Sequence, residues 1–233
     1  MGILAVIPAR GGSTRIPRKN IRKFCGAPLI SYSITAARNS GIFDKVIVST
    51  DDDEIATIAR SYGADVPFMR DKSLADNYTT TEPVIADALY RMEKNGYKAK
   101  AVACIYATAP LLTAEWVKKA YEEFDKSKVD VQFCCCEFPF PIQRAQYLDE
   151  KGYAHWVHPE FANTRSQDLP KTYQDAGMLY FYNPQYLRGE LAEGGQVRRG
   201  FIMPRYRVVD IDTEEDFTCA EALMRAVREL KLE

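Results

Sequence analysis

Histidine is scarce in this chain: His155 and His158 are the only two among 233 residues. Their spacing is weakly typical of metal ligands, but no third ligand lies near them in the sequence, so we place them at a surface or interface. The six cysteines form no CxxC pair, and three of them are consecutive at positions 134–136. This usage argues against a histidine-rich metal centre and against disulfides. It indicates reduced cysteines in a cytosolic protein, with the three consecutive ones buried.

Long hydrophobic runs and an excess of either charge are also missing. No apolar stretch approaches the roughly 20 residues that a membrane-spanning helix needs. Met1 leads directly into a short apolar segment, which we interpret as a strand rather than a signal peptide. The formal net charge is −1, whereas nucleic-acid-binding domains are usually strongly basic. We therefore expect a cytoplasmic protein whose partners are neither nucleic acid nor membrane.

Apolar strand-like runs alternate with amphipathic helical patterns, which predicts an α/β protein. Helices are expected at 29–40, 51–62, 79–95, 113–126 and 214–230. Strands are expected at 3–7, 45–50, 66–69, 101–106, 129–136, 178–182, 201–203 and 206–209. Thr79 and Glu82 have the spacing of a capping box at the start of the third helix. From 137 to 173 the alternation breaks into prolines, aromatics and short strand-like pieces. We interpret 1–233 as a single α/β domain in which 137–173 is an insertion.

The segment after the first strand, from Ile7 to Asn20 (IPARGGSTRIPRKN), has the composition of a phosphate-binding loop. Gly11 and Gly12 allow a tight turn that brings backbone N–H groups close to a ligand. Hydroxyl donors and four positive charges follow on this bent backbone, at Ser13, Thr14, Arg10, Arg15, Arg18 and Lys19. The loop is neither GxxxxGK[ST] nor GxGxxG, and the second absence argues against a dehydrogenase. The alternative interpretation is a basic surface loop.

A pair of carboxylates follows the last expected strand. At strand spacing Asp210 and Asp212 point the same way, and two carboxylates facing one point suit Mg²⁺. The alternative is helix capping, because Thr213 and Asp216 imitate a capping box; this explains Thr213 but not Asp210. Another acidic run, at 51–54, stands at a helix start, where carboxylates already complement the helix dipole, so we assign it a structural role.

The loop sequence resembles the amino-terminal signature of sugar-activating cytidylyltransferases, in the form found in the branch that handles nonulosonic acids. The later stretches FPFPIQR (138–144), NTRSQDL (163–169) and DAG (175–177) most resemble the pseudaminic acid cytidylyltransferases. The resemblance runs from about Ile3 to about Asp216. It implies a Rossmann-like, mixed but mostly parallel sheet with helices on both faces, of the nucleotide-diphosphosugar transferase type, plus a small dimerisation extension at 137–173. The reaction it implies is CTP + 2-keto sugar acid → CMP-sugar acid + pyrophosphate, in a homodimer.

The resemblance also assigns roles to individual residues. It implies catalytic roles for Arg10, Lys19, Asp210 and Asp212, with Mg²⁺ or Mn²⁺ bound by the two aspartates. The implied nucleotide-binding residues are Ala9, Arg10, Gly11, Gly12, Ser13, Thr14, Arg15, Lys19, Asn20, Arg70, Thr79, Thr80 and Thr108. For the sugar acid we select Tyr106, Arg165, Gln167 and Asp175. Arg165 suits a carboxylate through its paired donors, although a dimer contact is the alternative for Arg165 and Gln167.

The sequence departs from the related enzymes at three positions. Sialic acid enzymes commonly have Gln where Tyr106 stands and Arg where Leu112 stands, which argues against sialic acid. The nonulosonic branch usually has Lys at the position of Thr14, so Arg15 could supply the missing charge. The alternative functions are a cytidylyltransferase for legionaminic, sialic or 3-deoxy-manno-octulosonic acid, and a non-catalytic nucleotide-binding module on the same fold.

Overall fold

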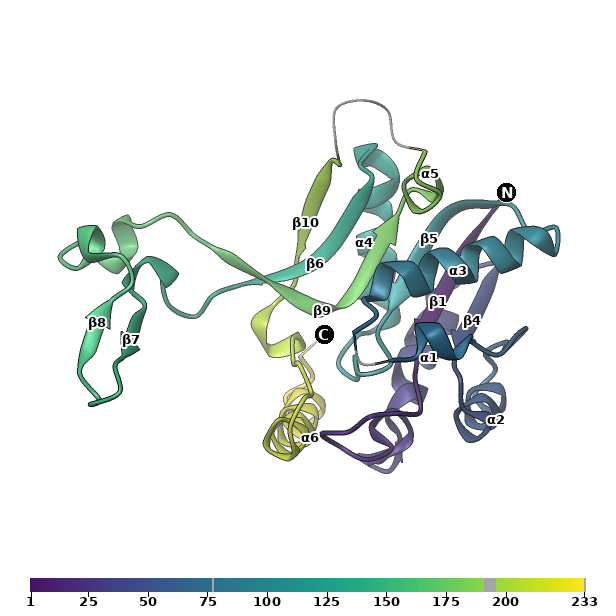
Figure 1. Ribbon diagram of the computed structural model, residues 1–233, viewed down its shortest axis with the longest axis horizontal. Helices are drawn as coiled ribbons and strands as arrows, with labels where there is room; N and C mark the ends of the chain where they lie inside the picture. The colour runs from purple at the N-terminus through teal and green to yellow at the C-terminus, as the bar shows by residue number, and fades with distance from the viewer. Residues whose placement is uncertain (77, 191–195, 233) are drawn as a thin grey trace.

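The chain folds around a six-stranded mixed sheet in a computed structural model that describes residues 1–76, 78–190 and 196–232. The strand order is β10-β6-β9-β5-β1-β4 (Figure 1). The strands are β1 (Gly2–Pro8), β4 (Lys45–Ser49), β5 (Ala99–Ile105), β6 (Val131–Glu137), β9 (Tyr173–Tyr182) and β10 (Arg198–Ile202). Strand β9 runs antiparallel between β5 and β6, and the other pairings are parallel. This sheet confirms the predicted α/β class.

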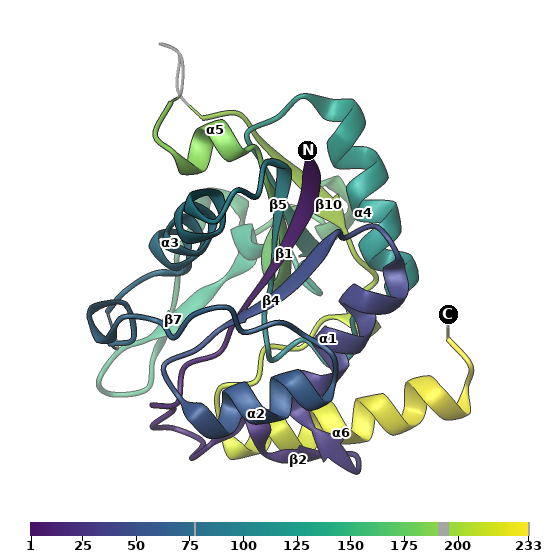
Figure 2. The same cartoon turned by 90° about the vertical axis from the view of Figure 1, so that its right-hand side faces the viewer.

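Helices cover both faces of the sheet (Figure 2). On one face lie α1 (Leu29–Ser40), α2 (Asp53–Ser61) and α4 (Ala114–Ser127), and on the other lie α3 (Thr81–Lys94) and the short α5 (Pro184–Leu187). Strand β1 is apolar on both sides, with Ile3, Ala5 and Ile7 facing the first group and Leu4 and Val6 facing the second. A strand buried on both faces reads as a continuous apolar run, which is why the sequence predicted it.

Helix α6 (Glu214–Glu229) packs on a small third core beneath the sheet. Its partners include the two-stranded hairpin of β2 (Lys23–Phe24) and β3 (Ala27–Pro28), and Phe24 packs edge-on against Phe217. Ile16, in the loop after β1, and Ile211, just before α6, belong to the same core and are fully buried. This core therefore fixes the basic loop and the segment that carries Asp210 and Asp212 against one another.

The predicted helix caps are mostly confirmed. Asp52 caps α2 by accepting hydrogen bonds from two backbone N–H groups, and Thr113 caps α4. Thr213 and Asp216 form a complete capping box at α6. The capping box predicted for Thr79 and Glu82 is wrong, because α3 begins at Thr81 after Thr80 and makes no side-chain cap.

Two predicted strands do not form. Residues 66–69 are irregular, because β4 pairs with this segment only through a single bridge at Asp65. In 206–209, the first two residues belong to the 3₁₀ turn at Arg205–Arg207, and the other two continue as loop toward α6. The prediction from strand spacing that placed Asp210 and Asp212 on one face therefore lacks the strand on which it was based.

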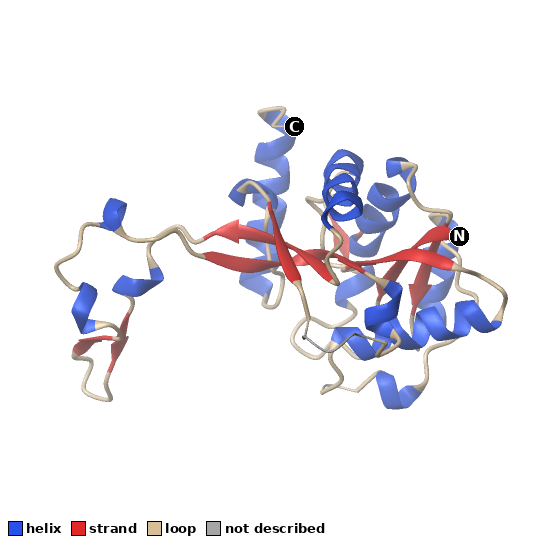
Figure 3. Cartoon of the chain, turned by 90° about the horizontal axis from the view of Figure 1, so that it is seen from above, coloured by secondary structure: helices blue, strands red, loops and turns tan. Residues whose placement is uncertain are grey.

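Residues 137–173 leave the body between β6 and β9 as a projecting arm (Figures 1 and 3). The arm carries a two-stranded hairpin, β7 (Gln146–Leu148) and β8 (Ala154–Trp156), and three 3₁₀ turns, at Ile142–Arg144, Pro159–Phe161 and Ser166–Asp168. His155 contacts Asp149 at 3.1 Å and His158 contacts Glu160 at 3.3 Å, so the two histidines face different carboxylates. Within the described ranges, no helix is both long and apolar enough to cross a membrane.

Candidate active site

A cavity of about 400 Å³ opens at the carboxyl ends of β1 and β5, beside the start of α3. This is the edge of a doubly wound sheet at which ligands usually bind. Eleven of the residues selected from the sequence line it: Arg10, Ser13, Thr14, Arg15, Lys19, Asn20, Arg70, Thr79, Thr80, Tyr106 and Thr108. The wall also contains six residues that the sequence analysis missed: Pro8, Leu74, Asp76, Thr81, Val84 and Ala107. Each of the six lies within four residues of a selected one, so only their neighbourhood could have indicated them.

The loop after β1 is fastened to the body at its base. Ala9 is buried, and its backbone N–H donates to the carbonyl of Ser49 at 2.9 Å. The Gly11 N–H donates to Oδ1 of Asp51 at 2.9 Å, and a Cβ at Gly11 would lie 2.7 Å from Oδ2 of Asp52. Gly11 is therefore required for close packing against the start of α2. Its N–H is committed to Asp51 rather than offered to a ligand.

The positive charges of the loop divide into two groups. Arg10, Arg15 and Lys19 line the cavity, and Asn20 holds the loop by donating to the carbonyl of Arg10 at 2.9 Å. Arg18 turns away, in a left-handed backbone conformation, and pairs with Asp52 and Glu54 of the α2 terminus. Arg18 is thus an anchor of the loop, whereas the other three cations line the cavity.

Arg70 lies in the wall of the cavity on the β4 side. Its side chain is buried, and its guanidinium donates to the Ser49 hydroxyl at 3.1 Å and to the Ser49 carbonyl. Burial lowers the pKa of Arg70 to about 10, which the nearby Asp51 charge partly opposes. The side chain therefore remains positively charged at neutral pH, as an anion-binding residue must.

Asp210 and Asp212 lie beside the loop cations. Asp212 contacts Arg15 at 2.8 Å and Lys19 at 3.3 Å, and Lys19 also donates to the carbonyl of Ile211. Partial desolvation and the Asp212 charge together raise the pKa of Asp210, although Asp210 itself reaches solvent. The shared core under Ile16 and Ile211 holds the segment of these two carboxylates against the loop after β1. The structure therefore places Asp212 against two loop cations, and the role of the pair as metal ligands stays a prediction.

The donor set of this carboxylate pair fits a hard divalent cation. Carboxylate oxygens are ligands that Mg²⁺ prefers, and Mg²⁺ typically takes one or two of them and completes its shell with phosphate oxygens and water. Among the described residues, no group of three or more His, Cys, Asp or Glu side chains is arranged to hold a metal. The pair therefore suits a cation that binds together with a phosphorylated ligand.

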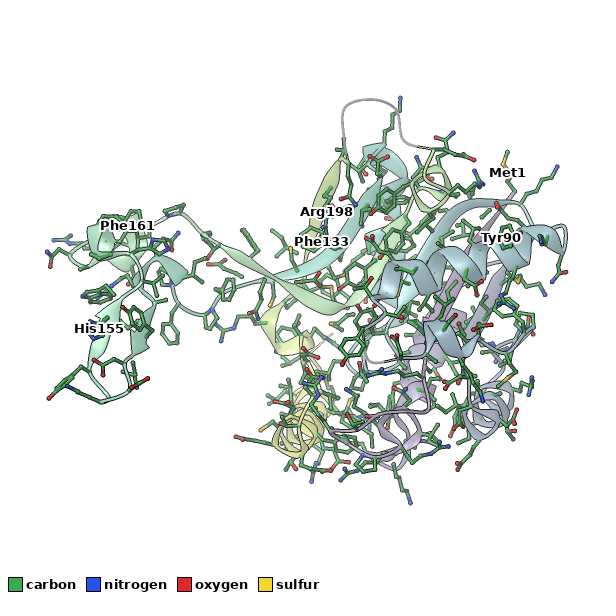
Figure 4. The ribbon with its side chains drawn as sticks, in the orientation of Figure 1. Met1, Tyr90, Phe133, His155, Phe161 and Arg198 are labelled. Carbon is green, nitrogen blue, oxygen red and sulfur yellow. The ribbon has the colours of Figure 1, made fainter. Side chains whose placement is uncertain are left out.

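The residues selected for the sugar acid separate in space. Tyr106 lines the cavity, and its hydroxyl lies 2.9 Å from the Thr81 hydroxyl. Asp175, on β9, accepts hydrogen bonds from the Tyr180 hydroxyl and the Gly177 N–H. Arg165 and Gln167 are exposed on the arm, whose Phe161 is labelled in Figure 4, and they do not line this cavity. One chain alone does not bring these two residues to its own site.

Fold and site together define a class of enzyme. An α/β sheet with three cations and several hydroxyls at its carboxyl edge, next to a carboxylate pair, can hold a nucleoside triphosphate and neutralise charge that develops on its phosphates. The profile of the cytidylyltransferase family matches residues 4–228, and the chain belongs to this family. Its members are nucleotidyltransferases.

Relatives of known name agree with this membership. A pseudaminic acid cytidylyltransferase of Campylobacter jejuni is 45% identical over 226 residues, which cover 97% of each chain. A CMP-N,N'-diacetyllegionaminic acid synthase of the same species is 36% identical, over 95% of this chain and 94% of the relative. Among solved structures, a CMP:2-keto-3-deoxy-manno-octonic acid synthetase in complex with CTP superposes with a TM-score of 0.70. The superposition covers 97% of this chain and 99% of the other at 18% identity, which shows a shared fold.

Proposed function

We propose that this enzyme transfers CMP from CTP to a nonulosonic acid, and that the acid is pseudaminic acid. The observation that carries the proposal is the 45% identity to a pseudaminic acid cytidylyltransferase across 97% of both chains. Two relatives named CMP-N,N'-diacetyllegionaminic acid synthase are less similar, at 36% and 38% identity. Legionaminic acid is therefore the second candidate, ahead of sialic and octulosonic acids.

The reaction follows from the chemistry of the cavity. The anomeric 2-hydroxyl oxygen of the sugar acid attacks the α-phosphorus of CTP and loses its proton. The bond from the α-phosphorus to the bridging oxygen breaks, and pyrophosphate leaves with that oxygen. Arg10, Arg15 and Lys19 hold the triphosphate and stabilise the negative charge that grows on the leaving group. Arg70 and the loop that contains Thr79 and Thr80 line the same cavity and hold the nucleotide.

Asp210 and Asp212 would hold the divalent cation, Mg²⁺ or Mn²⁺. When bound, that cation supplies positive charge at the α-phosphate and lowers the pKa of the attacking hydroxyl. Before substrate enters, Asp212 is neutralised by Arg15 and Lys19 instead. The same two cations are the natural partners of the phosphates, so substrate binding frees Asp212 for the metal.

The arm completes the assembly. We propose that residues 137–173 of one chain reach a second copy in a homodimer, and that Arg165 and Gln167 contact the sugar acid in the neighbouring site. Their exposure and their distance from their own cavity support this role. The remainder of the chain would then be a single catalytic domain. Because the reaction consumes CTP, we place the enzyme in the cytoplasm.

Pyrophosphate release tests the function. Purified enzyme is incubated with CTP, Mg²⁺ and, in turn, pseudaminic, legionaminic, sialic and octulosonic acids, with ATP, GTP and UTP as nucleotide controls. We expect release with CTP and pseudaminic acid at least about 10-fold faster than with any other acid, a ratio that corresponds to about 1.4 kcal/mol of transition-state stabilisation. Release with legionaminic acid instead would reassign the substrate within the family. Binding of CTP without release from any acid would favour the non-catalytic alternative.

A further inference from the structure

Strand β9 changes face in its middle. Side chains of a regular strand alternate, so Asp175 and Tyr180, five residues apart, belong on opposite faces of the sheet. They nevertheless meet, because the Tyr180 hydroxyl donates to Oδ1 of Asp175 at 2.7 Å. The alternation breaks between Met178 and Leu179, which both pack into the core under α1 and α4. This irregularity turns Asp175 to the α3 side, where Tyr180 lies.

The cause is a bulge opposite β6. Phe133 pairs with Tyr180, and Cys135, two residues later, already pairs with Asp175, so β9 carries extra residues between these pairs. Gly177, in the middle of the extra segment, has a φ of 58°, a conformation that favours glycine. Figure 4 labels Phe133, which marks the place on β6 opposite Tyr180. Bulges of this kind are over-represented beside active sites, where they re-aim a side chain.

The bulge is joined to the wall of the cavity. The backbone N–H of Tyr106 donates to the carbonyl of Met178, inside the bulge, at 2.9 Å. The ring centroids of Tyr106 and Tyr180 lie 5.5 Å apart, and the Tyr106 hydroxyl contacts that of Thr81 in the cavity wall. Tyr106 and Tyr180 therefore lie one after the other between the cavity and Asp175, which the Tyr180 hydroxyl contacts. Tyr180 is 9% exposed, whereas Asp175 is exposed. The Asp175 carboxylate thus faces solvent, and the side chain of Tyr180 lies between it and Tyr106 in the cavity wall.

The chemistry of this carboxylate is restricted. Burial, with the neighbouring Tyr106 and Asp175, raises the pKa of Tyr180, so Tyr180 keeps its proton and acts as a donor. Oδ1 of Asp175 accepts from both Tyr180 and the Gly177 N–H, while Oδ2 has no hydrogen bond to any described residue. An ionised carboxylate accepts hydrogen bonds only and repels another carboxylate. Oδ2 therefore suits a hydroxyl or amide N–H of a sugar and disfavours its acid group.

We propose that Tyr180 and the Gly177 bulge are positioning elements that aim Oδ2 of Asp175 at a neutral donor of the sugar, a hydroxyl or an amide N–H. This inference rests on the proposed function and names a determinant of acceptor choice within it. Tyr180 acts through Asp175 and does not touch the reacting atoms. The acid group of the sugar then lies away from Asp175, toward the cations.

Kinetics of the full-length enzyme with pseudaminic acid and saturating CTP test the proposal. Loss of a hydrogen bond to a charged group typically costs about tenfold or more in affinity. We therefore expect Tyr180→Phe to raise the KM for the acid about tenfold, with kcat and CTP affinity changed less than about twofold. The matched control is Tyr182→Phe, which removes the hydroxyl of a buried tyrosine on the same face of β9, with its ring 6.3 Å from Tyr180. This control should leave the KM within about twofold.

A double-mutant cycle separates positioning from general support. In an Asp175→Ala background, which should itself raise the KM at least as much, Tyr180→Phe should add nothing. A KM for Tyr180→Phe equal to that of Tyr182→Phe would overturn the proposal, and so would additive effects in the cycle. Turnover by the unchanged enzyme tests the function independently. Normal turnover with an unaltered KM in Tyr180→Phe would refute only this inference, while absent turnover would refute both.

Discussion

At the scale of single residues, Asp212 is the side chain of the site that pairs with two cations at once. Its carboxylate pairs with two cations, Arg15 at 2.8 Å and Lys19 at 3.3 Å. Its negative charge also contributes to the raised pKa of the nearby Asp210. If Asp212 holds the proposed metal, phosphates that pair with Arg15 and Lys19 would release its carboxylate for that cation. Binding of CTP and binding of the metal should therefore reinforce one another.

The variant Asp212→Asn separates these two roles. Without the second carboxylate, turnover should fall by at least about 100-fold, because the metal site has lost charge and a ligand. Binding of CTP in the presence of a chelator should not weaken, and could tighten severalfold, because Arg15 and Lys19 are released for the phosphates. Steady-state turnover and calorimetric titration of CTP with EDTA measure the two effects.

The control for this variant is Glu214→Gln, two residues away. Glu214 pairs with Arg22 at 2.6 Å, and neither residue lines the cavity. It should leave both turnover and CTP affinity within about twofold. Near-normal turnover in Asp212→Asn would remove the metal role, and a loss of CTP affinity in EDTA would remove the competition between carboxylate and phosphate.

Many of the residues selected from the sequence gather at one cavity, where charged and hydroxyl side chains are concentrated in the chain. A loop with three lysine or arginine side chains facing one cavity could be found from its composition alone, because such density of charge beside glycine and hydroxyl residues has few structural uses. The wall residues Leu74 and Val84 carry no chemical signal, since apolar residues are common everywhere. The separation of Arg18 from the other cations depends on one left-handed backbone angle, which no local pattern specified.

At the scale of elements, the start of α2 holds the loop after β1 in place. Asp51 holds the Gly11 N–H, while Asp52 caps the helix and pairs with Arg18. The Arg18 guanidinium and the backbone N–H groups of the helix lower the pKa of Asp52 to about 2, against the cost of its partial burial. A carboxyl with a depressed pKa stabilises the folded state above its ordinary pKa near 4, and this stabilisation is lost as the pH falls toward 2.

The substitution Asp52→Asn isolates the charge, because asparagine is as good a cap as aspartate. We expect a loss of about 1–2 kcal/mol in the free energy of unfolding at pH 7, after allowance for the solvent around this partly exposed pair. The difference from the unchanged protein should shrink as the pH falls below 4. Urea denaturation at pH 7, 4 and 3 measures it.

The neighbouring exposed residue provides the comparison for this substitution. Asp53 lies in the same first turn of α2, so Asp53→Asn loses a similar helix-dipole interaction without the arginine. It should cost at most about 0.5 kcal/mol. Equal losses in the two variants, or a difference that does not depend on pH, would contradict the role assigned to the Asp52–Arg18 pair.

Elements with strong local signals were predictable, and those that depend on partners were not. Helix α1 begins after Pro28 and ends at Gly41 in a left-handed conformation, as expected from periodicity and glycine placement. The segments 66–69 and 206–209 have apolar residues typical of strands but find no neighbouring edge to pair with beyond the bridge at Asp65. Strand pairing depends on residues that are far apart in the sequence, so composition alone predicted two strands that do not form.

At the scale of the whole molecule, the arm is the feature that one chain cannot explain. It exposes large apolar side chains far from any core, including Phe140 at 79%, Leu148 at 70% and Tyr153 at 66%. Several large exposed apolar side chains on one projecting element favour an interaction site. Figure 1 shows the hairpin of β7 and β8 projecting beyond the sheet, where a second copy can reach it.

We therefore predict that the enzyme is a dimer held in part by the arm. A variant with Leu148→Lys and Tyr153→Lys should elute as a monomer, because two charges would have to be desolvated in an apolar interface. The mass measured by light scattering should fall from twice 26.4 kDa to 26.4 kDa. The melting temperature of the variant should not be lower than that of the unchanged protein diluted until it dissociates, because neither side chain stabilises the body of the chain.

The control for the dimer is Tyr90→Lys, which makes a similar exchange on α3. Tyr90 is 56% exposed and lies on the opposite end of the molecule from the arm (Figure 4). If the arm is the interface, this control stays dimeric and active, while the arm variant loses both its partner and the Arg165 and Gln167 that the partner would contribute. A monomeric arm variant with full turnover would show that the arm assembles the enzyme without completing its site. An arm variant that remains a dimer would place the interface elsewhere and leave the apolar hairpin to another partner.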